Sequence, residues 1–85
     1  MRRFSDERGV EWVASVAAEQ GGDYKGRYYL ILHRPEAEDE EPVALTDVRW
    51  NSPRTAERTM NTMSSLELRR RLRSARGRAR AGAIA

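Results

Sequence analysis

Apolar and polar side chains alternate along the first part of the chain with a period of two, which is typical of a half-buried β-strand. Residues 4–17 contain this pattern, since every second residue from Val10 to Val16 is apolar. The alanines at the end of the segment would also suit a helix, but the alternation favours a strand, with or without a short lead-in. We therefore predict the first strand within residues 4–17.

Residues 27–34 form the clearest predicted strand. Aromatic and aliphatic side chains are concentrated there, and Pro35 closes the segment. The alternation assigns the side chains to two faces, with Tyr28, Leu30 and Leu32 on one face and Tyr29, Ile31 and His33 on the other. The glycine-rich residues 20–26 supply the positive φ angles that a turn before this strand needs.

Residues 43–50 return to an extended pattern after an acidic loop, the segment 35–42, in which two prolines bracket five acidic residues. The apolar positions change parity between Leu45 and Val48, which predicts either a β-bulge or the end of a strand at that point. Consecutive strands usually pair with one another, so residues 4–50 are predicted to form a small antiparallel meander of two or three strands.

One or two helices are predicted to follow the sheet. Ser52 is a favourable N-cap, and Pro53 suits the first helical position. The segment from Ser64 to Glu67 matches a capping box, which predicts either the start of a second helix or a kink in a longer one. The fold class predicted for the chain is therefore α+β, a small meander followed by one or two C-terminal helices.

The last helical segment carries an apolar stripe beside a basic one. Two series recur at the same helical spacing, Leu68, Leu72, Ala75 and Ala79 in one stripe and Arg69, Arg73, Arg76 and Arg80 in the other. Gly77 weakens a helix by about 1 kcal/mol relative to alanine. We predict that residues 1–76 form a single domain, which includes an Arg-rich amphipathic helix at 65–76, and that residues 77–85 form a frayed basic and alanine-rich tail.

Net positive charge is confined to the C-terminal end of the chain. Residues 1–67 hold nine Lys or Arg against thirteen Asp or Glu, a balance of −4, whereas residues 68–85 hold seven Arg and no acid, so the two parts sum to the net charge of +3. Fifteen of the sixteen basic residues are Arg, an excess that either function or a GC-rich genome would produce. The segregation of charge indicates binding to an anionic partner.

A non-catalytic interaction protein is the function that this pattern favours, an accessory or regulatory subunit that docks on an acidic surface of a larger protein assembly. In this hypothesis Leu68 and Leu72 are apolar anchors, and an exposed Tyr29 is a further anchor. The arginines form a charged rim that orients the partner, namely Arg69, Arg73, Arg76 and Arg80.

Three alternatives stay open at this stage. The arginines could bind the phosphates of nucleic acid while aromatic side chains stack on bases, the candidates being Tyr24, Tyr28, Tyr29 and Trp50. An anionic membrane surface is disfavoured, because the apolar stripe has no Trp or Phe to insert. Alternatively, Leu68 and Leu72 pack on the domain's own sheet, and the arginines face water or the acidic loop.

No catalytic, cofactor or metal site is expected. The chain has no Cys and a single His, His33, so it cannot build a thiolate or histidine cluster, and the acidic loop lacks the spacing of a calcium loop. It also lacks a nucleophile-elbow motif, and Asp23 would repel a phosphate from the adjacent glycines. No segment approaches the about 20 apolar residues of a transmembrane helix, and no apolar signal segment is present. We therefore expect a cytoplasmic protein that is not an enzyme.

Overall fold

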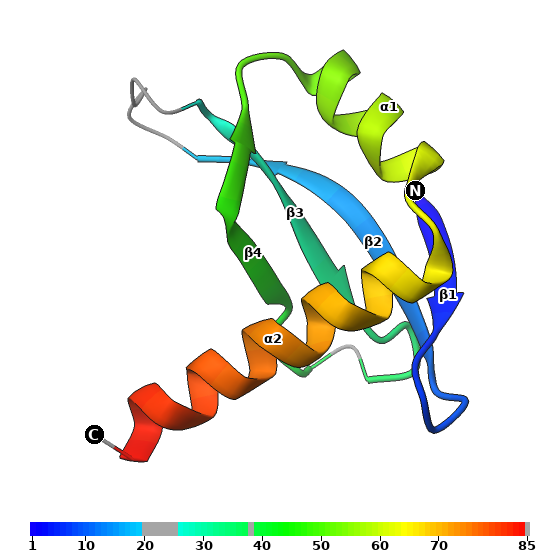
Figure 1. Cartoon of the computed structure of the whole chain (residues 1–85), viewed down its shortest axis with the longest axis vertical. Helices are drawn as coiled ribbons and strands as arrows, with labels where there is room; N and C mark the ends of the chain where they lie inside the picture. Colours follow the sequence, from blue (N-terminus) through cyan, green and yellow to red (C-terminus); the bar gives the residue numbers. More distant parts are fainter. Residues whose placement is uncertain (20–25, 38, 85) are drawn as a thin grey trace.

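A computed structural model of the chain describes residues 1–19, 26–37 and 39–84, and in the last helix it describes side chains as far as Gly77. Within these ranges, four antiparallel strands form one sheet in the order β1-β2-β3-β4, and two helices follow (Figure 1). The elements are β1 (Arg2–Ser5), β2 (Glu11–Ala18), β3 (Tyr28–His33), β4 (Val43–Trp50), α1 (Pro53–Thr62) and α2 (Ser65–Ile84). The predicted α+β meander is confirmed, with four strands where two or three were predicted.

The additional strand lies at the start of the chain, where residues 2–18 form a β-hairpin instead of the one strand predicted within residues 4–17. Strand β1 pairs with β2, so that Phe4 lies opposite Trp12. The turn between them is closed by a hydrogen bond from the Asp6 amide to the Val10 carbonyl at 2.9 Å, and Gly9 in the turn has φ of 80°. Strand β1 was missed because its short sequence is mostly polar and shows no apolar alternation.

The register of the sheet brings the apolar side chains of successive strands together on one face. Ala14 lies opposite Leu32, and Leu30 lies opposite Leu45. In the pairing of β3 with β4 the register shifts, since Tyr28 pairs with Trp50 while Leu30 pairs with Leu45. Of the two predicted alternatives, a bulge or the end of a strand, this irregularity agrees with the first, since β4 continues through it.

Two separate helices follow, because the backbone is extended between them. Ser52 caps α1 by accepting a hydrogen bond from the Thr55 amide, and Met63 ends that helix with φ of −72° and ψ of 136°. Ser64 then caps α2, accepting a hydrogen bond on its hydroxyl from the Glu67 amide at 3.1 Å. A single kinked helix is therefore excluded, and both predicted N-caps are confirmed.

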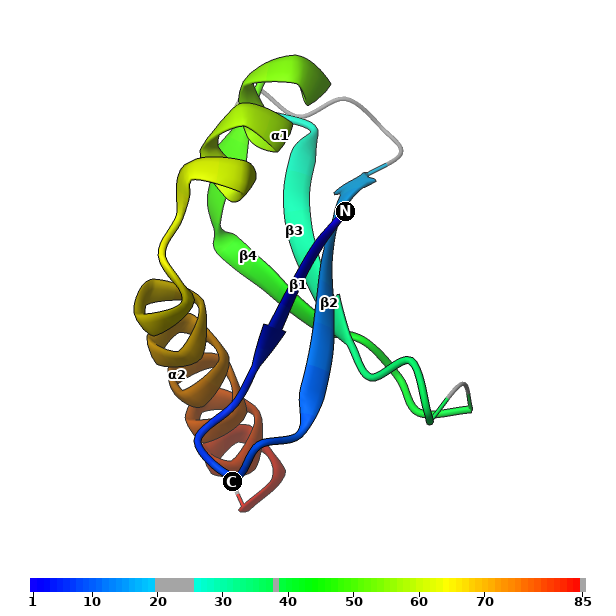
Figure 2. The ribbon, with the colours of Figure 1, turned by 90° about the vertical axis from the view of Figure 1, so that its right-hand side faces the viewer.

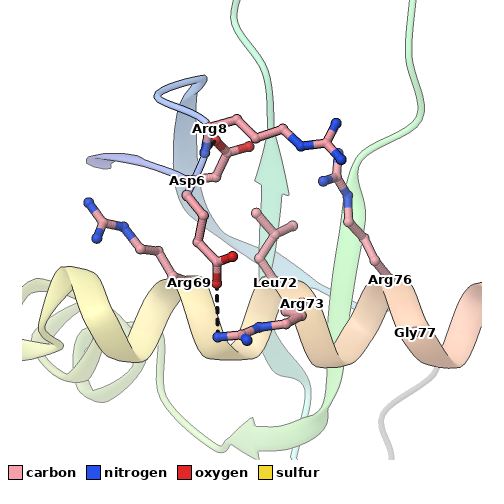
Figure 3. A pocket seen from close by; sticks show the side chains of 8 residues that line it. Asp6, Arg8, Arg69, Leu72, Arg73, Arg76 and Gly77 are labelled. Atoms are coloured by element: carbon pink, nitrogen blue, oxygen red, sulfur yellow. Dashed lines mark hydrogen bonds and ion pairs between the residues drawn. The ribbon is translucent and has the colours of Figure 1, made fainter.

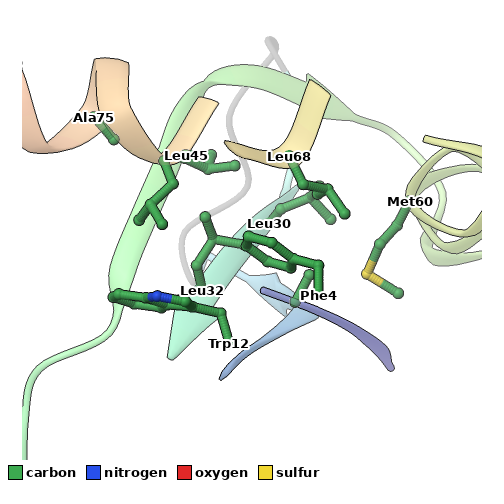
Figure 4. Packing of buried hydrophobic residues seen from close by; sticks show 10 residues of the cluster. Phe4, Trp12, Leu30, Leu32, Leu45, Met60, Leu68 and Ala75 are labelled. Carbon is green, nitrogen blue, oxygen red and sulfur yellow. The ribbon is translucent and has the colours of Figure 1, made fainter. Parts of the chain in front are cut away.

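Both helices lie on the same face of the sheet (Figure 2), and the core fills the space between the two layers (Figure 4). Helix α1 packs on β2, β3 and β4, whereas α2 packs on β4 and β1. The buried cluster combines side chains from all six elements, namely Phe4, Trp12, Ala14, Leu30, Leu32, Leu45, Met60, Leu68, Leu72 and Ala75.

The helical backbone of α2 continues past Gly77 to Ile84, whereas the sequence predicted a frayed tail over 77–85. Gly77 has no neighbouring atom within 4 Å of the position that a Cβ would occupy, so it lies on an open side of the helix. In the turn predicted for residues 20–26, residues 20–25 lie outside the described ranges. Gly26 is described and has φ of 102°, as a turn glycine requires.

Candidate functional site

An open groove of about 640 Å³ runs between the β1–β2 turn and one flank of α2 (Figure 3). We call it the arginine groove. Its lining residues come from these two segments alone and are Asp6, Glu7, Arg8, Arg69, Leu72, Arg73, Arg76 and Gly77. Four of them are arginines, and three of these belong to the basic stripe that the helical spacing predicted.

Asp6 organises the turn that forms one wall of the groove. Its carboxylate accepts hydrogen bonds from the backbone amides of Arg8 at 2.8 Å and Val10 at 3.0 Å. The other carboxylate oxygen accepts a hydrogen bond from the indole Nε1 of Trp12 at 3.0 Å. Asp6 is therefore occupied by three N–H donors of its own hairpin.

These contacts lower the pKa of the Asp6 carboxyl group. Partial burial acts to raise that pKa, but the hydrogen bonds from Trp12, Val10 and Arg8 and the positive charge of Arg76 together outweigh it. A carboxyl group whose pKa is lower in the folded state stabilises the fold fully above its unfolded pKa of about 3.9. That stabilisation is lost as the pH falls through the folded pKa.

We expect the Asp6→Asn variant to lower the free energy of unfolding at neutral pH by about 1–3 kcal/mol, because hydrogen bonds to a charged acceptor are lost. The difference from wild type should shrink below about pH 4, where the Asp6 carboxyl group of the unfolded chain becomes protonated before that of the folded protein. Urea denaturation at neutral pH and at about pH 3 measures both values. The neighbouring Glu7→Gln is a matched control, whose exposed ion pair should contribute at most about 1 kcal/mol. A constant difference across this pH range would contradict the role given to the Asp6 charge.

The three groove arginines of α2 each contact the β1–β2 hairpin. The Nε of Arg69 donates a hydrogen bond to the carbonyl oxygen of Ser5 at 2.6 Å, although the two residues are 64 positions apart in the sequence. Arg73 forms an ion pair with Glu7 at 2.9 Å. The guanidinium carbon of Arg76 lies 4.8 Å from the centre of the Trp12 ring, within the range of a cation–π interaction.

Arg8 and Arg76 differ from Arg73 in making no ion pair with a carboxylate among the described residues. Figure 3 shows their side chains extending toward one another from the turn and from the helix. Counting the whole lining, four arginines stand against Asp6 and Glu7, a balance of +2. The groove therefore keeps positive charge that the described part of the chain does not neutralise.

Among the described residues, no ion pair joins the acidic loop to the basic helix. Glu40 forms an ion pair with Arg34, which lies next to the loop in the sequence. The ion pairs that α2 makes are with Glu7 and, one turn away along the helix, between Arg71 and Glu67 at 3.6 Å. Glu38 lies outside the described residues.

The solvent-facing side of α2 is a second surface, formed by Leu66, Arg70 and Arg73. Leu66 is 56% exposed, and Arg70 is exposed with no ion pair among the described residues. Residues three and four positions apart share one side of a helix, so Arg70 lies beside Leu66 and Arg73 lies beside Arg70. We call this surface the outer face of α2.

The predicted apolar anchors lie elsewhere. Leu68 is fully buried in the domain's own core (Figure 4). Leu72 is 3% exposed and belongs to the same core cluster. They cannot reach a partner in this fold, so the prediction that they anchor one is wrong. The alternative that they pack on the sheet is the correct one, because a domain this small needs the apolar side of each of its two layers to form a core.

The remaining predicted site residues do not gather in one place. Tyr29 is partly buried on strand β3, where the guanidinium carbon of Arg49 lies 5.2 Å from its ring centre. The side chain of Arg80 lies outside the described residues, as does Tyr24. Tyr28 lies opposite Trp50, which packs against the core cluster.

Sequence reasoning missed the hairpin side of the groove, which Asp6, Glu7 and Arg8 supply. The signal that could have found it is the spacing of Asp6 and Gly9, which is typical of a turn that an aspartate side chain closes. Recognising that turn would have divided the predicted first strand into two and identified Arg8 as a turn residue. Its position beside α2 would still have required the tertiary structure.

In the described part of the chain, no His, Cys, Asp or Glu side chains form a group of three or more that could hold a metal ion. Among the same residues, no helix is both long enough and apolar enough to cross a bilayer. A scan of protein-family models and searches of curated proteins and of solved structures found no match to this chain. Its function is therefore inferred from its own residues.

Proposed function

We propose that the chain is a non-catalytic interaction protein, an accessory or regulatory subunit that docks on an acidic surface of a larger protein assembly through the outer face of α2. The observation that carries this proposal is the exposed leucine, Leu66, beside the unpaired cation Arg70. Leu66 takes the anchoring role that the sequence had assigned to Leu68 and Leu72.

The chemistry of the outer face suits an acidic protein partner. An exposed aliphatic side chain contributes to binding when a partner pocket removes it from water. Arginines at the rim of such a contact attract acidic side chains, orient the partner and raise the association rate. Arg70 is the arginine of this face that is exposed and makes no side-chain hydrogen bond or ion pair among the described residues, so its charge is available to a partner.

Nucleic acid is the weaker candidate, because the aromatic rings and the cationic surface that it would use lie in different places. Stacking on bases requires exposed aromatic rings beside the cationic surface. Tyr28 and Trp50 are paired on β3 and β4, Trp50 packs against the core, and Tyr29 is covered in part by Arg49. None of these three rings lines the arginine groove.

Charge reversal on the outer face tests the proposal. We expect the double variant Leu66→Ser and Arg70→Glu to lower recovery of a co-purifying protein from nuclease-treated native lysate at least about tenfold, since it removes both the anchor and the free cation. Arg58→Glu is the matched control, because Arg58 is exposed on α1 and lies outside both basic surfaces of α2. Quantitative mass spectrometry of the eluates measures the recovery.

Recovery at the wild-type level by the double variant would overturn the proposal. A partner that is lost upon nuclease treatment would instead favour nucleic acid. In that case a salt titration on duplex DNA should have a log–log slope near about −6 for seven phosphate contacts.

A further inference from the structure

We infer that the arginine groove is a binding site for a dianionic oxyanion of the phosphate class, held between Arg8 of the β1–β2 turn and Arg76 of α2. The site uses Arg8 and Arg76, whereas the docking proposal uses Leu66 and Arg70, and Arg73 borders both surfaces. The inference does not depend on the docking proposal.

The first argument is the balance of charge inside the groove. Asp6 already accepts three N–H donors, and Glu7 is paired with Arg73 at 2.9 Å. Both carboxylates of the groove therefore already have partners, whereas Arg8 and Arg76 make no ion pair among the described residues, although the charge of Arg76 lies near enough to Asp6 to lower its pKa. The balance of +2 over the lining residues matches the charge of a phosphate monoester dianion.

The second argument is the convergence of two like charges. Arg8 and Arg76 come from segments far apart in the sequence, yet they extend toward one another across the groove (Figure 3). Two cations that converge at a partly screened surface repel one another by an amount that an anion placed between them would offset. Such an arrangement is typical of a site that binds an anion.

The third argument is that both sides of the site are already in position. Arg76 lies over the Trp12 ring at 4.8 Å, and the Trp12 indole is in turn bonded to Asp6 at 3.0 Å. The backbone of Arg8 is held by the same Asp6 carboxylate at 2.8 Å. One aspartate thus orients the turn and the ring that face Arg76, which reduces the ordering needed when a ligand binds.

The guanidinium groups and the size of the groove indicate that it recognises the phosphate group of a larger ligand. Guanidinium groups bind phosphate through two parallel hydrogen bonds, and two such groups can contact one phosphate from different sides. A groove of about 640 Å³ is larger than a phosphate ion and lies in the range of ligand pockets, so a phosphate monoester with its substituent fits the space. A carboxylate carries only one charge and would leave part of the positive charge unmatched.

Titration calorimetry at constant ionic strength with inorganic phosphate, phenyl phosphate, dimethyl phosphate and acetate tests the inference. We expect saturable binding of one inorganic phosphate and of one phenyl phosphate per chain at neutral pH. Dimethyl phosphate and acetate carry a single charge, so each should bind at least about tenfold more weakly. Arg8→Gln and Arg76→Gln should each lower the phosphate affinity about tenfold or more, because each removes a charge-assisted hydrogen-bond donor.

Two controls separate the site from other effects. Arg58→Gln removes an exposed arginine of α1 and should leave phosphate affinity unchanged. The Leu66→Ser and Arg70→Glu variant should also keep its phosphate affinity, so a failure of docking and a failure of this site are distinguishable. Near-ultraviolet circular dichroism of Trp12 and the other aromatic residues monitors the fold of each variant.

The absence of saturable phosphate binding would overturn the inference. Equal binding of phenyl phosphate and dimethyl phosphate would overturn the assignment to a dianion, and would indicate general attraction of anions such as a phosphodiester backbone. An equal loss of affinity in Arg58→Gln and Arg8→Gln would also overturn it, because binding would then follow net charge and not the groove.

Discussion

Replacing Leu68 with alanine should lower the free energy of unfolding by about 2–5 kcal/mol, the range observed when large aliphatic side chains are removed from protein cores. Leu68 is fully buried between α2 and the sheet. Small domains are stable by only about 5–15 kcal/mol, so this loss is a large part of the total. Urea denaturation followed by far-ultraviolet circular dichroism measures the change, and the midpoint should fall without a large change in slope.

Leu66→Ala is the matched control on the same helix. Leu66 is 56% exposed, so this substitution should change stability by no more than about 0.5 kcal/mol while weakening the docking proposed for the outer face. Comparing the Leu68→Ala and Leu66→Ala variants therefore separates the effect of core packing from the effect of partner binding. A stable Leu68→Ala protein that only loses its partner would contradict the fold and restore Leu68 as an anchor.

The Gly26→Ala variant should lose about 2–4 kcal/mol of stability, for two reasons. Gly26 has φ of 102°, which L-residues rarely adopt. A Cβ at this position would also lie 2.9 Å from the carbonyl oxygen and 3.0 Å from the carbonyl carbon of Trp50, and neither backbone atom can move without displacing β4. Thermal and urea denaturation measure the loss.

Substitutions at two other glycines separate the effect of the positive φ angle from that of the close approach to Trp50. Gly9 has φ of 80° but nothing within 4 Å of a Cβ, so Gly9→Ala should lose only the backbone contribution of about 1–2 kcal/mol. Gly77 lies in α2 with open space around it, so Gly77→Ala should gain about 1 kcal/mol of stability. If Gly26→Ala were no more destabilising than Gly9→Ala, the close approach to Trp50 would not be a constraint on the fold.

Elements with strong local patterns were predicted close to their observed positions. The residues predicted as a strand at 27–34 contain β3, and Ser52, Pro53 and Ser64 mark the starts of the two helices as predicted. These features depend on side-chain periodicity and on hydrogen bonds between residues near in sequence, so a single chain is enough to read them.

Strand β1 could not be read in the same way. Its four residues include one apolar side chain, Phe4, so alternation is too short to detect. Its place at the sheet edge comes from pairing with β2, in which Phe4 lies opposite Trp12. The closing turn was detectable from Asp6 and Gly9, but the strand became evident only from its partner.

For the candidate site, the helical spacing placed Arg69, Arg73 and Arg76 on one side of a helix, and the structure places all three in the arginine groove. The spacing did not reveal that the β1–β2 turn lies against that side. Contacts such as the hydrogen bond from Arg69 to the Ser5 carbonyl join residues 64 positions apart, and no local pattern encodes them.

Charge segregation, the two helix starts and the basic stripe of α2 follow from the order of residues alone, because they depend on composition and on neighbours within one or two turns. The fold decided which side of that helix is buried, and it therefore moved Leu68 and Leu72 from a partner surface into the core and left Leu66 outside. It also brought Arg8 beside Arg76, since packing of α2 on β1 is a contact between the two ends of the chain. Which side chains are buried, and which distant residues lie close together, is decided only when the helices and the sheet pack around the one small core of the domain.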